Sequence, residues 1–216
     1  MSRLRLWIAM SLDGFVAGPA QDVDNPLGVG GMQLHEWVLP LAVWREAQGL
    51  EGGGLNESTP VVEASMANIG ATVMGRNMFG GTGPWGEDPW NGWWGDDPPY
   101  HHPVFVLTHH AREPLVCEGG TTFMFVTDGI EVALDRARTA ATGRDISLAG
   151  GAQTARQYLE ADLVDEMEIN LVPVLLGEGE RLFDGLGAGN PRLAHVRTVA
   201  APGVTHLKFD RAENRG

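Results

Sequence analysis

The chain has 216 residues and a formal net charge of −13, with 43 % hydrophobic and 20 % charged residues. This composition supports a packed globular core and excludes a disordered or collagen-like chain. A surface this acidic repels phosphate backbones, so nucleic-acid binding is not expected. No apolar run approaches the roughly 20 residues of a membrane span.

The length predicts a single domain over residues 1–216, with a Trp/Gly-rich loop at 80–103. The one cysteine, Cys117, excludes an intrachain disulfide and favours a cytoplasmic location. In chain order, we expect a strand at 4–10, helical turns at 34–47 interrupted by Pro40, and a helix at 59–68 that Ser58 and Thr59 can cap. Strands at 71–75, 104–108 and 121–127 should follow, then a helix at 128–142 capped by Asp128 and a strand at 145–149. The last predicted elements are a helix at 151–161, a strand at 166–172 and a hairpin of 193–200 and 204–210.

Strands that alternate with helices predict an α/β fold, with a mainly parallel central sheet, helices on both faces and an antiparallel C-terminal hairpin. The strand at 166–172 alternates in sequence: Met167, Ile169 and Leu171 on one face, Glu166, Glu168 and Asn170 on the other. We therefore expect it to have one apolar and one polar face.

Three predicted strands end in groups that suit phosphate. Gly150 and Gly151 stand between a strand and a helix, where backbone N–H groups and the helix dipole favour an anion. Gly75, Arg76 and Asn77 follow a second strand, and Thr108, His109 and His110 a third. Because ligands collect at the carboxyl edge of an open α/β sheet, the three ends together indicate an extended ligand such as a dinucleotide. The alternative for the glycine pair alone is a tight turn.

The chain resembles the dihydrofolate reductase-like superfamily, in the branch that includes the C-terminal reductase domain of bacterial riboflavin biosynthesis. The resemblance covers nearly the whole chain, and five motifs carry it in family order: "IAMSLDGFVAG" (8–18), "VMGRNMF" (73–79), "VFVLT" (104–108), "LAGGAQTARQYL" (148–159) and "DEMEINLVPVLLGEGERLFDGL" (165–186).

This resemblance implies an NADPH-dependent reductase. It places the cofactor on Ile8 and Ala9 (nicotinamide), Leu12 and Gly14 (the loop over it), Gly75, Arg76 and Asn77 (adenosine-side phosphates), Leu107, Thr108 and His109 (ribose 2′-phosphate), and Ala149, Gly150, Gly151, Ala152, Gln153 and Thr154 (pyrophosphate). The family usually has an arginine where His109 stands, so preference for NADPH over NADH depends mostly on Arg76.

The substrate side offers two candidate catalytic acids, Asp13 in "SLDG" and Glu63, the only acid of its predicted helix. A buried carboxyl with a raised pKa could relay a proton while hydride reaches carbon. The equal alternative for Glu63 is a solvated helix residue. The implied substrate is a small pteridine- or aminopyrimidine-like heterocycle reduced at C=N or C=O. The alternatives are a reductase of a secondary metabolite and a non-catalytic dinucleotide-binding dimer.

Three further expectations concern surfaces. Trp85, Trp90, Trp93 and Trp94 either form a stacking wall for a flat substrate or bury against the body of the protein or a second subunit. No metal is expected, because the pair His101 and His102 has no second ligand cluster at metal-binding spacing. The apolar stretch 166–183 favours a homodimer over coverage by a helix of the same chain.

Overall fold

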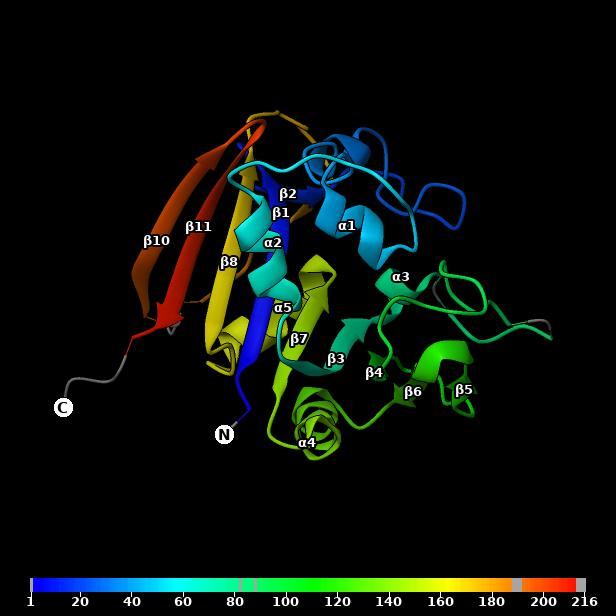
Figure 1. Cartoon of the computed structure of the whole chain (residues 1–216). Helices are drawn as coiled ribbons and strands as arrows, with labels where there is room; N and C mark the ends of the chain where they lie inside the picture. Colours follow the sequence, from blue (N-terminus) through cyan, green and yellow to red (C-terminus); the bar gives the residue numbers. More distant parts are fainter. Residues whose placement is uncertain (1, 82, 88, 188–191, 213–216) are drawn as a thin grey trace.

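The fold is described from a computed structural model that covers residues 2–212 except 82, 88 and 188–191 (Figure 1). Its described residues form a nine-stranded sheet in the order β10-β11-β8-β1-β7-β3-β4-β6-β5. The strands are β1 (Leu4–Ser11), β3 (Ile69–Gly75), β4 (Pro103–Leu107), β5 (Leu115–Val116), β6 (Thr122–Val126), β7 (Asp145–Gly150), β8 (Glu166–Val172), β10 (Leu193–Ala201) and β11 (Val204–Arg211). Two short strands, β2 (Phe15–Ala17) and β9 (Glu180–Arg181), pair antiparallel beside it.

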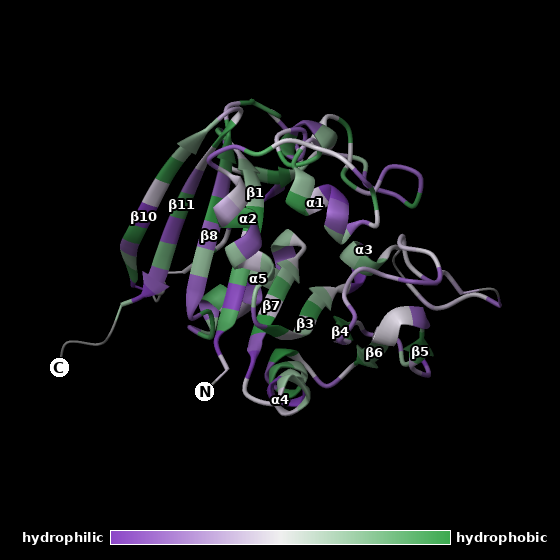
Figure 2. Ribbon diagram, viewed as in Figure 1, coloured by the Kyte–Doolittle hydropathy of each residue, from purple (hydrophilic) through white to green (hydrophobic). Residues whose placement is uncertain are grey.

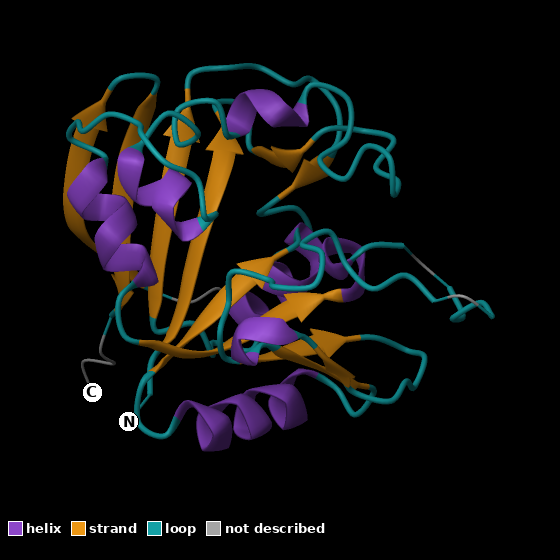
Figure 3. Ribbon diagram, turned by 45° about the vertical axis from the view of Figure 1, so that its right-hand side comes forward, coloured by secondary structure: helices purple, strands orange, loops and turns teal. Residues whose placement is uncertain are grey.

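The helices are α1 (Ala42–Ala47), α2 (Thr59–Met66), α3 (Arg76–Phe79), α4 (Ile130–Ala141) and α5 (Ala152–Glu160), with 3-10 turns η1 (Gly31–Leu34) and η2 (Glu118–Gly120). Strands β8, β1, β7, β3, β4 and β6 pair in parallel, and β11 and β10 add the antiparallel hairpin. Helices lie on both faces of the sheet (Figure 3). The predicted fold class is confirmed.

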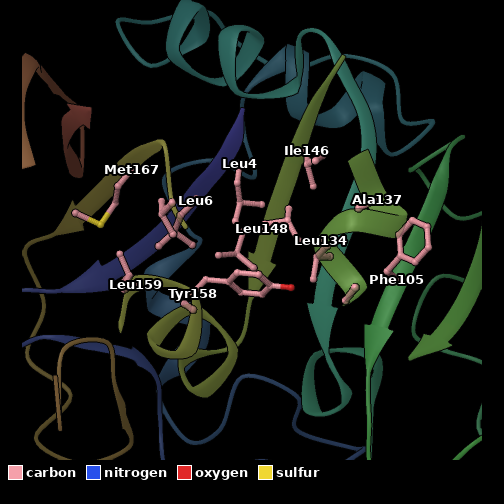
Figure 4. Packing of buried hydrophobic residues seen from close by; sticks show 14 of the residues in the cluster. Leu4, Leu6, Phe105, Leu134, Ala137, Ile146, Leu148, Tyr158, Leu159 and Met167 are labelled. Carbon is pink, nitrogen blue, oxygen red and sulfur yellow. The ribbon is translucent and has the colours of Figure 1, made fainter. Parts of the chain in front are cut away.

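Helices α4 and α5 cover one face of the sheet. Leu134 and Ala137 of α4 and Tyr158 and Leu159 of α5 pack with side chains of β1, β7 and β3 (Figure 4). The Tyr158 hydroxyl donates to the Ile130 carbonyl oxygen at 2.8 Å, which ties α5 to the first residue of α4. Burial of these side chains is the main driving force for the packing of both helices on the sheet.

Two separate clusters cover the other face. Helices α1 and α2 and η1 enclose a cluster around Leu34, Trp37 and Val38, and the loop after α3 encloses another around Phe79 and Phe123. Central strands such as β3 are mostly hydrophobic, whereas the hairpin strands β10 and β11 alternate in hydropathy (Figure 2). Two indoles of this loop bond to the residues of α3: those of Trp90, which is 38 % exposed, and Trp93 donate to the carbonyl oxygens of Phe79 and Met78.

The polar face of β8 is buried, a feature that the predicted alternation does not specify. Glu166 is 5 % exposed, Glu168 3 % and Asn170 0 %. Cations from neighbouring strands compensate the carboxylates: Arg3, Arg5 and Lys208 reach Glu166 at 3.0–3.1 Å, and Arg197 reaches Glu168 at 2.7 Å. Buried charges persist when they are paired in this way. Alternation in the sequence identified the face but not what covers it.

Two predicted helix caps are also absent, since neither α2 nor α4 has a side-chain cap bond. The Ser58 hydroxyl instead lies 2.8 Å from His206 Nε2, and His206 Nδ1 lies 2.6 Å from Asn170 Oδ1. All three side chains are buried. Asp128 pairs with Arg136 at 3.1 Å, and Gly129 holds the cap position of α4. Of the helical turns expected at 34–47, only α1, after Pro40, is an α-helix.

Because His206 is buried, we expect the protein to lose stability in mild acid. Burial, with a smaller effect of Arg197, lowers the pKa of His206 to about 4, against about 6.5 in an unfolded chain. The unfolded state therefore binds a proton between these values that the folded state does not. The free energy of unfolding should fall as pH drops below 6.5, with a His206 share of about 2 kcal/mol at pH 5.

Urea unfolding at pH 7.5 and 5.0 gives the change in the free energy of unfolding between the two pH values. The His206 share is the difference in that change between the wild type and His206→Gln. Subtracting the variant removes the contribution of other groups, including His102, whose pKa burial also lowers to about 4. Equal pH dependence in the two proteins would contradict the prediction.

Candidate cofactor site

The strand ends that the sequence singled out lie along one edge of the sheet. Strands β1, β7, β3 and β4 are consecutive neighbours and run parallel. Their carboxyl ends therefore follow one another in space, with Gly150 closing β7, Gly75 closing β3 and Leu107 closing β4. Such an edge is where open α/β sheets bind ligands.

A pocket of about 250 Å³ opens at this edge. Seven predicted cofactor residues line it: Arg76, Asn77, Leu107, Thr108, His109, Gln153 and Thr154. The remaining predicted residues lie outside its lining, at the ends of β1, β7 and β3 and in the turns that follow: Ile8, Ala9, Leu12, Gly14, Gly75, Ala149, Gly150, Gly151 and Ala152. The pocket lining therefore includes seven of the sixteen predicted cofactor residues.

The glycines at the strand ends, Gly75 and Gly151, differ in the space around them. A Cβ at Gly75 would overlap Thr154 Oγ1, so a larger residue there would force the Thr154 side chain away from the end of β3. At Gly151, which precedes α5 with φ −70°, a Cβ would meet no atom within 4 Å. The backbone at Gly151 therefore borders open space, as a cradle for a phosphate requires. The peptide bond between Gly150 and Gly151 is cis.

Arg76 is the strongest sign of an anion site. Its Nε and Nη1 atoms are buried and have no hydrogen-bond partner among the described residues. Burial, and then the nearby Arg112, lower the pKa of its guanidinium. Native structures rarely leave buried donors unpaired. An anion in the pocket would supply the missing acceptors, and Arg76 could bind a phosphate through two parallel hydrogen bonds.

Part of the pocket wall escaped the sequence prediction. It consists of Gly83, Val126, Thr127, Gly129, Ile130 and Gln157, whereas His110, which also lines the pocket, belongs to the predicted strand end after β4. Thr127 and Gly129 follow the strand β6 and precede α4, so they repeat the strand-end pattern that identified the other segments. The same rule applied to a fourth strand could have found them.

Asp13 does not have the raised pKa expected of a proton relay. Its carboxylate accepts hydrogen bonds from the Ser11 hydroxyl at 2.6 Å and from the backbone N–H groups of Leu176 and Gly177 at 3.1 and 2.8 Å. These bonds, led by that from Ser11, lower its pKa to about 2. Asp13 is therefore ionised at neutral pH and ties the turn after β1 to the loop after β8.

Glu63 lies on the exposed side of α2. It is not the buried acid that the family pattern implies, and the solvated alternative describes its surroundings. Leu12, beside Asp13, is 60 % exposed, and its N–H donates to the Val174 carbonyl oxygen at 2.9 Å.

Among the described residues, no group of three or more His, Cys, Asp or Glu side chains is placed to hold a metal ion. No helix in the same part of the chain is long and apolar enough to cross a membrane.

Comparison with known proteins gives consistent matches along the chain. YyaP, an uncharacterized protein of Bacillus subtilis (strain 168), is 28 % identical over 213 residues, covering 96 % of this chain and 94 % of YyaP. A putative riboflavin biosynthesis protein from Shewanella sp. PV-4 has a TM-score of 0.63 at 23 % identity, covering 98 % of this chain and 99 % of its own.

A dihydrofolate reductase from Enterococcus faecalis, solved with NADP(H) and RAB-propyl, has a TM-score of 0.51 at 14 % identity, covering 98 % of this chain and 97 % of its own. These two structural likenesses show a shared fold, as the motifs had indicated. The model of the RibD C-terminal domain matches residues 3–207. The chain therefore belongs to the RibD C-terminal domain family.

Proposed function

We propose that the protein is an NADPH-dependent reductase of a small heterocycle. The observation that carries this proposal is Arg76, whose guanidinium lines the pocket at the carboxyl edge of the sheet and has two buried N–H groups without described partners. Two buried N–H groups of a cation at a ligand edge favour an anionic acceptor there. A ribose 2′-phosphate would supply that acceptor and the 2′-hydroxyl of NADH would not, whereas the pyrophosphate is common to both dinucleotides.

The neighbouring residues suit the rest of a dinucleotide. Thr108 and His109 stand beside Arg76 in the pocket wall, and Gly151 with the N-terminus of α5 offers backbone donors for a pyrophosphate. Ile8 and Ala9, two strands from β3 across β7, would face the nicotinamide end. When bound, NADPH supplies the hydride, and the protein positions it and excludes water.

The substrate is proposed from family membership as a pteridine- or aminopyrimidine-like heterocycle reduced at C=N or C=O. One observation supports the second candidate, a dinucleotide-binding protein without turnover: Asp13 is ionised and Glu63 is exposed, so neither is a buried acid. Oxidation of NADPH in the presence of such heterocycles distinguishes the two functions.

The homodimer stays a prediction, but the exposed apolar surface that would favour it is smaller than the sequence indicates. Met167 and Ile169 of β8 pack in the cluster under α4 and α5, and Val174 and Leu176 pack in the cluster around Trp37. Leu175 is 71 % exposed. Most of the apolar stretch is therefore covered by the same chain, the alternative that the sequence left open.

Thermal unfolding with added dinucleotide tests the proposed function. A ligand that binds only the folded state stabilises it by about 2.7 kcal/mol at one hundred times its dissociation constant. We expect millimolar NADPH to raise the melting temperature by several degrees, and NADH to raise it less. No shift with either dinucleotide would contradict the proposal.

A further inference from the structure

Trp85, in the loop between α3 and β4, covers the guanidinium of Arg76. The Arg76 Cζ lies 3.6 Å from the centroid of the Trp85 ring, against 5.9 Å from that of Phe79. A planar guanidinium at this distance is held by stacking and by attraction to the ring quadrupole. The indole therefore occupies one side of a cation whose buried N–H groups have no described acceptor.

Other contacts fix Trp85 itself. Its Nε1–H donates to the His110 carbonyl oxygen at 2.9 Å, and its ring packs edge-on against Phe79 and Phe125 with centroids 6.1 and 5.0 Å away. The His110 N–H lies 3.1 Å from Thr108 Oγ1. One side chain thus connects Arg76 with the pocket segment after β4.

Arg112 holds the loop in place over this contact. Its guanidinium donates to the Trp90 carbonyl oxygen at 2.7 Å and to Asn91 Oδ1 at 2.6 Å, and its Cζ lies 4.8 Å from the Trp85 ring centroid. Both acceptors are neutral, so these bonds leave the charge of Arg112 beside that of Arg76 uncancelled. Two like charges sharing one indole favour an anion nearby.

We propose that Trp85 is a positioning residue that orients Arg76 toward the 2′-phosphate and so gives the Trp/Gly-rich loop a role in selecting NADPH over NADH. The inference rests on the proposed function. Stacking fixes the plane of the guanidinium before the ligand arrives, which reduces the conformational entropy lost on binding. A flexible Arg76 would retain its charge but not this orientation.

The test measures dissociation constants for NADPH and NADH by calorimetry in Trp85→Met and Trp85→Phe. Methionine fills apolar space against Phe79 and Phe125 without a ring face; phenylalanine retains the face. We expect Trp85→Met to weaken NADPH about 5- to 10-fold and NADH less than about twofold, and Trp85→Phe to restore most of the loss. Trp94→Leu, in the same loop but with its ring against Tyr100 and Phe123, is the matched control and should bind both as the wild type does.

A double variant separates positioning from packing. If Trp85 acts through Arg76, then Arg76→Ala with Trp85→Met should bind NADPH no more weakly than Arg76→Ala alone. Equal loss of both dinucleotides in Trp85→Met, or losses that multiply in the double variant, would overturn the inference. If Trp85→Met bound NADPH as the wild type does while Arg76→Ala lost that binding, the inference about Trp85 would be overturned. The proposed function would stand in that case. A wild type that binds neither dinucleotide would overturn both.

If Trp85→Met does not fold, the Arg76 Nε–H resonance of the wild type provides the measurement, assigned with Arg76→Lys. We expect an upfield ring-current shift that changes on addition of NADPH and not of NADH. A resonance without that shift, or one that responds equally to both dinucleotides, would overturn the inference.

Discussion

Replacing Arg76 with alanine should weaken NADPH binding about 10- to 100-fold and leave NADH binding within about threefold of the wild type. The physical reason is the loss of a charged hydrogen bond, worth roughly 1.5–3 kcal/mol, which only the 2′-phosphate can make. Calorimetric titration of both dinucleotides measures the two constants. The change breaks no described hydrogen bond at Nε or Nη1 but removes the stacking on Trp85, so the melting temperature of the variant is measured beside its binding constants.

Two other outcomes for Arg76→Ala have distinct meanings. Equal weakening of NADPH and NADH would place the guanidinium on a phosphate that both share, and the specificity argument would fail. Binding of both at wild-type strength would remove Arg76 from the ligand site altogether. Arg138, a partly exposed arginine that pairs with Asp135 on α4, is the matched control, and Arg138→Ala should change neither constant.

Gly151→Ala should separate binding from folding. Because φ at Gly151 is −70° and a Cβ there would meet no atom within 4 Å, we expect an unchanged melting temperature. The same methyl group would project into the space proposed for the pyrophosphate. Binding of both dinucleotides should therefore weaken by about tenfold or more, about 1.4 kcal/mol.

The control for Gly151→Ala is Gly54→Ala, an exposed position where a Cβ also meets nothing within 4 Å. It should affect neither melting temperature nor binding. A Gly151→Ala protein that melts and binds as the wild type does would contradict a pyrophosphate position at the start of α5. Gly75→Ala is the opposite case, because its Cβ would overlap Thr154 Oγ1. This substitution should lower the melting temperature.

The parts of the site that the sequence predicted follow from local rules. Arg76 and Thr108 were identified because each directly follows an apolar strand, and strands that alternate with helices run parallel and end at one edge. The structure brings these two residues together in one pocket. The same reasoning applied to β6 would have added Thr127 and Gly129.

Other features depend on contacts between residues far apart in the chain, which no local pattern contains. The leading cause of the lowered pKa of Asp13, the hydrogen bond from Ser11, lies within "SLDG". The further bonds from Leu176 and Gly177 come from more than 160 positions away, and the local sequence gives no sign of them. Trp85 lies in a stretch without periodicity. Its place over Arg76 depends on the path of the whole loop, which Arg112 holds.

A crystal structure of the protein grown with NADP⁺ tests the central claim most directly. The account predicts density for the dinucleotide along the carboxyl edge of β1, β7, β3 and β4, with the 2′-phosphate within hydrogen-bond distance of Arg76 and the pyrophosphate against the backbone of Gly151. A well-ordered dinucleotide elsewhere on the molecule, or a pocket that stays free of it at saturating concentration, would contradict the account.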